Sequence, residues 1–189
     1  MSESYPRVEF ASREQWRAWL AANHGSARGA WAVTYGKGGP EPHVSYEELV
    51  LEAVAHGWID STRRRVDDRR TEMLMTPRKP TSGWSRSNKE RVERLEREGL
   101  MAPAGRRAVE VAKQNGSWAL LDDVEDLVEP EELAAALDSV PNARAHWDAF
   151  PPSARKAALL WIATAKRPAT RARRIAETAR LAGEDERAR

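Results

Sequence analysis

The chain of 189 residues contains no cysteine. It therefore cannot form a disulfide, a thiolate metal site or a cysteine nucleophile. Long apolar runs are missing as well. The first twenty residues carry Glu3, Arg7, Glu9, Arg13 and Glu14, so they lack the apolar segment of a signal peptide, and no later stretch is apolar enough to span a bilayer. These absences predict a cytoplasmic protein that does not insert into a membrane.

Recognisable catalytic motifs are also absent. Residues 36–39 combine glycines with a lysine but lack P-loop spacing, which predicts a simple turn. Ser82 and Ser85 lack the Gly-x-Ser-x-Gly context of a hydrolase. Glu52 and His56 have a spacing that can chelate a metal, but a helix-end ion pair is favoured because no third ligand is evident. We therefore expect no metal and no cofactor, and the sequence leaves open whether the protein is an enzyme.

The charges are abundant and unevenly distributed. Residues 62–97 hold twelve Lys/Arg against six Asp/Glu, residues 121–138 hold eight acids and no base, and residues 166–174 hold five bases and no acid. Basic runs of this kind can follow the phosphates of a nucleic acid. Solvated faces with ion pairs at helical spacing are the commoner explanation, so nucleic-acid binding is the disfavoured alternative.

The first 120 residues show the signals of both helices and strands. Capping boxes begin at Ser12, Ser45 and Ser87 and predict three helices, and Pro103 predicts the start of a fourth. Strand composition over 30–35, 58–66 and 70–76 predicts a small antiparallel sheet in which the last two strands form a hairpin. Alternation places Trp58, Asp60 and Arg64 on one face of that sheet.

The remaining residues predict helices only. Apolar periodicity and Pro, Ser or Thr at the helix starts indicate helices over 130–137, 141–150, 153–165 and 170–181, after an acidic connector at 122–126. The fold class expected from the whole pattern is therefore α+β: a small antiparallel sheet with helices in the N-terminal part, followed by an all-helical C-terminal module.

The motifs resemble those of the YdeI/OmpD-associated family over nearly the whole chain. The motifs that carry the resemblance include Gly57-Trp58-Ile59-Asp60-Ser61, Thr76-Pro77-Arg78, Ser82-x-Trp84-Ser85-x-x-Asn88, Trp161-Ile162, Ala165-Lys166-Arg167 and Thr170-Arg171. The resemblance implies a YdeI-like α+β domain over residues 1–120 and a helical OmpD-associated module over residues 121–189 that packs on it. The family carries the label bacteriocin protection, and no reaction is attached to its residues.

One candidate site follows from the predicted hairpin. The second strand presents Trp58 and Asp60 on one face, and the loop after the third strand returns towards them, since antiparallel strands end where their partners begin. Aromatic rings in such a loop can form flat walls, while arginine and asparagine can anchor an anionic group. The predicted ligand-binding residues are Trp58, Asp60, Arg78, Trp84, Ser85 and Asn88.

The sequence thus favours a cytoplasmic ligand-binding or stress-tolerance protein, with bacteriocin or antimicrobial-peptide tolerance implied by the resemblance. The partner expected at the site is a small anionic ligand. The first alternative is an enzyme that acts on a small anionic metabolite in the same cleft, and the second is a nucleic-acid-binding module. The sequence does not fix the oligomeric state.

Overall fold

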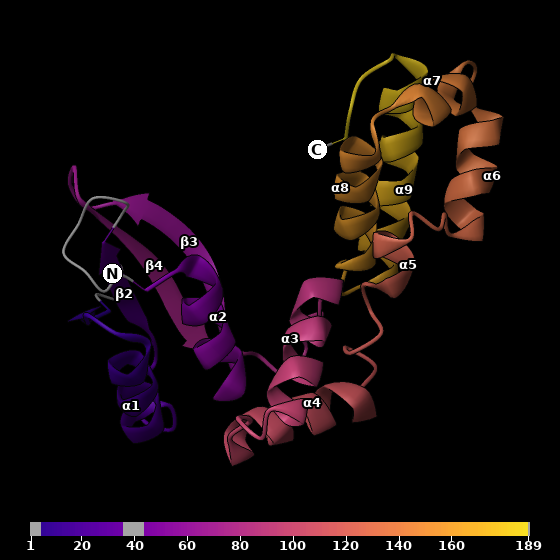
Figure 1. Cartoon of the computed structure of the whole chain (residues 1–189). Helices are drawn as coiled ribbons and strands as arrows, with labels where there is room; N and C mark the ends of the chain where they lie inside the picture. The colour runs from indigo at the N-terminus through magenta and orange to yellow at the C-terminus, as the bar shows by residue number, and fades with distance from the viewer. Residues whose placement is uncertain (1–4, 36–43, 189) are drawn as a thin grey trace. The chain divides into compact units, whose positions relative to one another are not determined.

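The computed structural model describes residues 5–35 and 44–188 (Figure 1). The turn expected at residues 36–39 lies outside the described residues. The chain forms two compact units: the first comprises residues 1–82 and 87–117, and the second comprises residues 83–86 and 118–189. Within the described ranges, no helix has both the length and the apolar character needed to cross a membrane.

The first unit contains a four-stranded sheet of order β1-β2-β4-β3. The strand β4 (Arg70–Pro77) lies between β2 (Ala30–Tyr35) and β3 (Trp58–Arg65) and pairs antiparallel with both, and β3 and β4 form the predicted hairpin. A fourth strand, β1 (Arg7–Glu9), runs parallel to β2 and makes the sheet mixed. The sequence did not predict β1 because three residues are too few to show a periodic pattern.

Four helices accompany the sheet among the described residues of the first unit: α1 (Arg13–Asn23), α2 (Tyr46–Ala55), α3 (Arg86–Arg97) and α4 (Pro103–Gln114). The Ser12 side chain caps α1, and Ser45 opens α2 with a complete capping box, as predicted. The helix α3 begins at Arg86, one residue before the expected cap at Ser87. Its first residue thus belongs to the second unit and the rest of the helix to the first.

The core of the first unit lies between the sheet and the helices α1 and α2, which occupy the same side of the sheet in Figure 1. The sheet face towards them is apolar, and α2 is buried around its whole circumference from Leu49 to Ala55. Trp16 joins the two helices because its indole nitrogen donates to the Leu49 carbonyl at 3.1 Å. The fully buried residues of this sheet face are Ala30, Ala32, Met75 and Trp58.

A β-bulge in β3 changes which side chains share a face. Asp60 pairs with Met75 but Arg63 pairs with Met73, so β3 holds one more residue than β4 between these pairs. Arg64 then pairs with Glu72, which is three residues from Met75 and therefore points to the opposite face. The prediction that Arg64 shares a face with Asp60 was wrong, because simple alternation does not account for the inserted residue.

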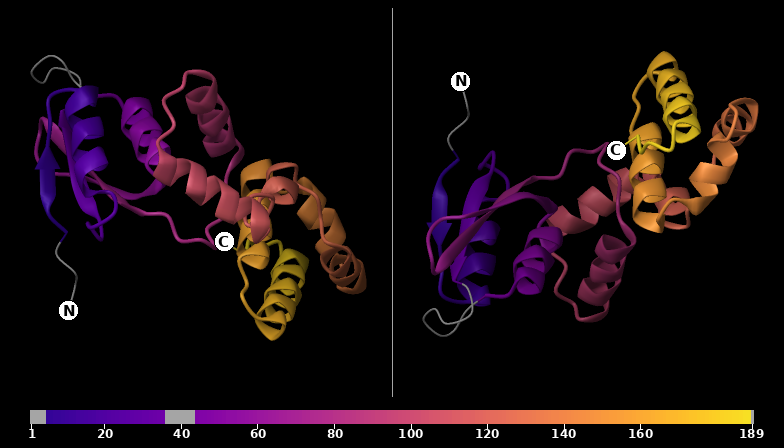
Figure 2. Two further views of the ribbon diagram at one scale, coloured as in Figure 1. Left: turned by 90° about the horizontal axis from the view of Figure 1, so that it is seen from below. Right: turned by 90° about the horizontal axis from the view of Figure 1, so that it is seen from above.

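The second unit is helical and has its own core. Its helices are α5 (Asp122–Glu125), α6 (Glu131–Ser139), α7 (Ala143–Ala149), α8 (Pro152–Ala163) and α9 (Pro168–Gly183). The 16-residue α9 contacts α6, α7 and α8 (Figures 1 and 2). The residues buried in this core include Leu133, Leu137, Trp147, Leu159, Ile162 and Ile175. The predicted fold class is confirmed.

The short segment Gly83–Arg86 packs with the second unit although the chain on either side of it belongs to the first. A Cβ atom on Gly83 would lie 2.7 Å from Cγ of Leu121, so only glycine fits there without a shift. The rings of Trp84 and Trp118 lie 5.1 Å apart, and Arg86 forms an ion pair with Asp126. The chain therefore crosses between the units on both sides of this segment.

Candidate functional site

Polar side chains from two helices, a strand and a loop gather in the first unit. The Tyr46 hydroxyl, at the start of α2, donates to Oδ2 of Asp60 on β3 at 2.9 Å. On α3, Arg91 donates to Oδ1 of Asn88 at 3.0 Å and to Glu47 at 2.6 Å. We refer to these residues together with Arg78 as the Asp60 cluster: Tyr46, Glu47, Asp60, Arg78, Asn88 and Arg91.

Arg78 is the most buried cation of the Asp60 cluster, with 9% of its surface exposed. Its backbone amide donates to the Gly57 carbonyl at 2.9 Å, which holds the loop after β4 against the start of β3. Burial lowers the pKa of Arg78 to about 10, and the nearby Asp60 carboxylate opposes this shift without cancelling it. Burial therefore outweighs the effect of Asp60 on this pKa, and an additional anionic group would stabilise the charged guanidinium.

The protonation states of Tyr46 and Glu47 make the first a hydrogen-bond donor and the second an acceptor. Burial and the hydrogen bond to Asp60 raise the pKa of Tyr46, so its hydroxyl stays protonated and can donate. The hydrogen bond from Arg91 lowers the pKa of Glu47, which remains a carboxylate. The arrangement can therefore orient a polar ligand, whereas a protonated tyrosine is poorly suited to act as a base.

The structure brings three of the predicted site residues into this cluster: Asp60, Arg78 and Asn88. Trp58 lies beside them in sequence but is 1% exposed, with its indole nitrogen donating to the His24 carbonyl at 3.2 Å and its ring against the edge of Trp19. Trp84 is also 1% exposed. Both indole rings therefore belong to the hydrophobic core and do not form exposed walls of a ligand site, because burial of an indole is strongly favourable.

Trp84 and the half-buried Ser85 lie in the segment that packs with the second unit. Three members of the Asp60 cluster were not predicted: Tyr46, Glu47 and Arg91. Asn88 and Arg91 have the i,i+3 spacing of neighbours on a helix, which is a usable signal. The contact between Arg91 and Glu47 joins residues 44 positions apart, so no local pattern could indicate it.

Glu52 and His56 do not form a chelating pair. The Glu52 carboxylate binds Nε of Arg13 at 2.5 Å and Nε of Arg17 at 2.6 Å, which ties α1 to α2. Nδ1 of His56 instead lies 2.9 Å from the Glu52 carbonyl oxygen. Among the residues that the structure describes, no group of three His, Cys, Asp or Glu side chains is arranged to hold a metal ion.

Many arginines of the two basic runs are engaged in local pairs. In the β3–β4 hairpin, Arg65 pairs with Asp68, and Arg70 pairs with Asp67 at 2.7 Å. On the opposite sheet face from Asp60, Arg64 pairs with Glu72 and stacks over Trp31 at 3.8 Å. The pairs of Arg65 and Arg70 are those expected of a solvated, ion-paired surface, whereas the Glu72 carboxylate is almost fully buried.

The chain thus comprises an α+β domain that carries the partly buried Asp60 cluster, followed by a helical module. Residues 8–108 match a domain of unknown function, DUF8412, and since this match spans more than half of the chain, the chain belongs to that family. Residues 126–184 match the bacteriocin-protection, YdeI or OmpD-associated family, which confirms the resemblance in the C-terminal module. No curated protein and no solved structure gave a match.

Proposed function

We propose that the protein binds a small anionic ligand at the Asp60 cluster and acts without catalysis. The observation that carries this proposal is the buried guanidinium of Arg78, whose desolvation the Asp60 carboxylate only partly offsets. An anionic ligand group on Arg78 would lower that cost. Asn88, Tyr46 and Asp60 would then orient the uncharged part of the ligand by hydrogen bonds.

The physiological role that we propose is tolerance to bacteriocins or other antimicrobial stress, exerted in the cytoplasm. This rests on the name of the family that matches residues 126–184. Enzymatic action on a small anionic metabolite at the same cluster is the alternative. Binding is favoured over catalysis because the Tyr46 hydroxyl is held protonated and its hydrogen bond occupies an oxygen of Asp60.

Thermal unfolding of the full-length protein in a panel of small anions tests the proposal. The panel contains inorganic phosphate, sulfate, acetate, succinate and citrate, each at constant ionic strength. A bound anion at about 100 times its dissociation constant should add about 2.7 kcal/mol to the free energy of unfolding. Arg78→Met should abolish that gain, because it removes the charge while keeping an apolar stem in place.

The stability of Arg78→Met without any anion separates a binding role from a structural one. A ligand-binding Arg78 predicts a loss well below the ~3–5 kcal/mol that follows when a buried ion pair is broken. Arg106→Met is the matched control, since Arg106 is an exposed arginine of the same unit that pairs with Glu96. The proposal is wrong if no anion raises the unfolding temperature, or if Arg78→Met retains the gain.

A further inference from the structure

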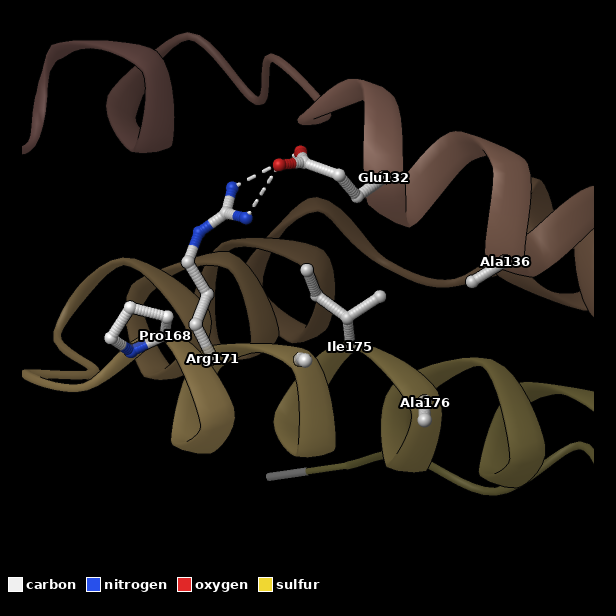
Figure 3. Close-up of a pocket in the computed structure, with 7 residues that line it drawn as sticks. Glu132, Ala136, Pro168, Arg171, Ile175 and Ala176 are labelled. Carbon is white, nitrogen blue, oxygen red and sulfur yellow. Dashed lines mark hydrogen bonds and ion pairs between the residues drawn. The ribbon is translucent and has the colours of Figure 1, made fainter.

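The second unit contains a groove between α6 and α9 that the Asp60 cluster does not involve. It has a volume of about 350 Å³ and is lined by Ala136, Ala172, Ile175 and Ala176, with Pro168 at one end (Figure 3). Five of its residues lie on α9 at helical spacing from Pro168 to Ala176, which corresponds to a length of about 12 Å at 1.5 Å per residue. We call it the α6–α9 groove.

One end of the α6–α9 groove is closed by an ion pair rather than by packed side chains. Arg171 spans it and donates to both carboxylate oxygens of Glu132, at 2.9 Å and 3.3 Å (Figure 3). The Glu132 side chain is 63% exposed. An ion pair with so exposed a partner contributes ~0–1 kcal/mol, so an incoming carboxylate can displace Glu132 from the guanidinium.

The start of α9 carries cations that attract an anion, while Glu131 and Glu132 in the first turn of α6 oppose it. Lys166 and Arg167 directly precede α9, and within residues 5–35 and 44–188 neither of them forms an ion pair. The helix also begins without a side-chain cap, so the positive end of its dipole adds to the same potential. The remainder of the groove is formed by alanine and isoleucine side chains and suits an apolar chain.

We propose that the α6–α9 groove binds a small amphiphilic anion, an unbranched alkyl carboxylate. Its carboxylate takes the place of Glu132 on Arg171, and its alkyl chain lies along Ile175, Ala136 and Ala176. The volume falls within the ~300–1,000 Å³ of small-molecule sites. This inference concerns the second unit and does not depend on the function proposed for the Asp60 cluster.

Titration of the full-length protein with decanoate, below its micelle concentration, tests the proposal by calorimetry and by amide chemical shifts. Decanoate should bind with one site per chain and perturb the amides of α6 and α9. Arg171→Met should weaken binding about tenfold, the change that follows from losing a charge-assisted pair of ~1.4 kcal/mol. Decanol, which has the same chain without the charge, should bind correspondingly more weakly.

Two further variants distinguish a site from nonspecific attraction. Glu132→Gln should tighten decanoate binding, because it removes the competing carboxylate, whereas a purely structural Glu132–Arg171 pair predicts no gain. Ala176→Leu, at an exposed position, should weaken binding by filling the groove. Arg173→Met is the control, since Arg173 lies on α9 but does not line the groove.

The proposal is overturned if decanoate does not bind, if decanol binds equally well, or if Glu132→Gln leaves the affinity unchanged. It is also overturned if Arg173→Met weakens binding as much as Arg171→Met, because general charge attraction would then account for the effect.

Discussion

Two carboxylates of the first unit are almost fully buried, and each binds two guanidinium groups. Glu52 is held by Arg13 and Arg17, while Glu72 is held by Arg7 at 2.7 Å and by Arg64. The hydrogen bond from Arg7 is the main cause that lowers the pKa of Glu72. These two carboxylates have a structural role, because arginine donors of the protein already occupy their oxygens.

His56 is the residue through which mild acid should act on stability. Its ring is buried, and burial lowers its pKa below the ordinary 6.5. Nδ1 donates to the Glu52 carbonyl, because a carbonyl only accepts. The unfolded chain therefore binds a proton at a higher pH than the native protein does. Stability should rise with pH through the window just below 6.5 and fall as the solution is acidified through it.

Urea denaturation between pH 5 and pH 7.5 measures this dependence. His56→Asn keeps a donor near the Glu52 carbonyl but cannot gain a proton, so its stability should vary less over that range. An equal slope in the wild-type protein and the variant would show that another group is responsible.

At the scale of secondary structure, local signals predicted most elements correctly. The capping residues Ser12 and Ser45 and the strand composition of β2, β3 and β4 act within a few residues, so the sequence shows them directly. The strand β1 depends on pairing with β2, and the β3 bulge depends on register with β4. Neither has a local signature, so the sequence could not predict them.

Gly105 lies where α4 packs closely against the end of α2. A Cβ atom there would lie 2.3 Å from the Ala55 carbonyl oxygen, and the Ala102 amide donates to this same oxygen at 3.1 Å. Alanine normally stabilises a helix interior by ~0.5–1 kcal/mol relative to glycine. Here Gly105→Ala should instead lower the free energy of unfolding by ~1–3 kcal/mol, because backbone must move to make room.

Gly25→Ala provides the control for this substitution, since no atom lies within 4 Å of a Cβ built at Gly25. Its denaturation midpoint should stay close to that of the wild-type protein. A raised midpoint for Gly105→Ala would contradict the contact between α4 and the end of α2.

At the scale of the whole chain, the candidate site was only partly predictable. Hairpin geometry correctly indicated that Asp60 and Arg78 are close enough to interact. It could not indicate that Trp58 is buried against Trp19, or that Trp84 packs with Trp118. Those outcomes depend on side-chain contacts between segments distant in sequence, and apolar burial outweighs any preference of the rings for an open surface.

The distribution of ion pairs predicts weak nucleic-acid binding by the whole protein. Arginines of the hairpin and of α9 pair with nearby acids such as Asp67, Asp68 and Glu132. These acids repel phosphates and compete for the guanidinium groups. Duplex and single-stranded DNA should bind weakly, without sequence preference, and lose affinity steeply as salt is raised. Sub-micromolar binding in a fluorescence-anisotropy titration at physiological salt would refute this expectation.

The path of the chain leads to a prediction about truncation. Gly83–Arg86 packs with residues 118–189, where Gly83 meets Leu121 and Trp84 meets Trp118. A fragment that ends at Trp118 lacks Leu121 and the core that follows it. We expect this fragment to expose Trp84, bind a hydrophobic dye and aggregate. The full chain should unfold in one transition. Trp84→Gln in the fragment is the control and should restore solubility if the exposed ring causes the aggregation. A soluble fragment 1–118 with sharp near-ultraviolet circular dichroism, and two separate unfolding transitions in the full chain, would instead show that the units fold independently.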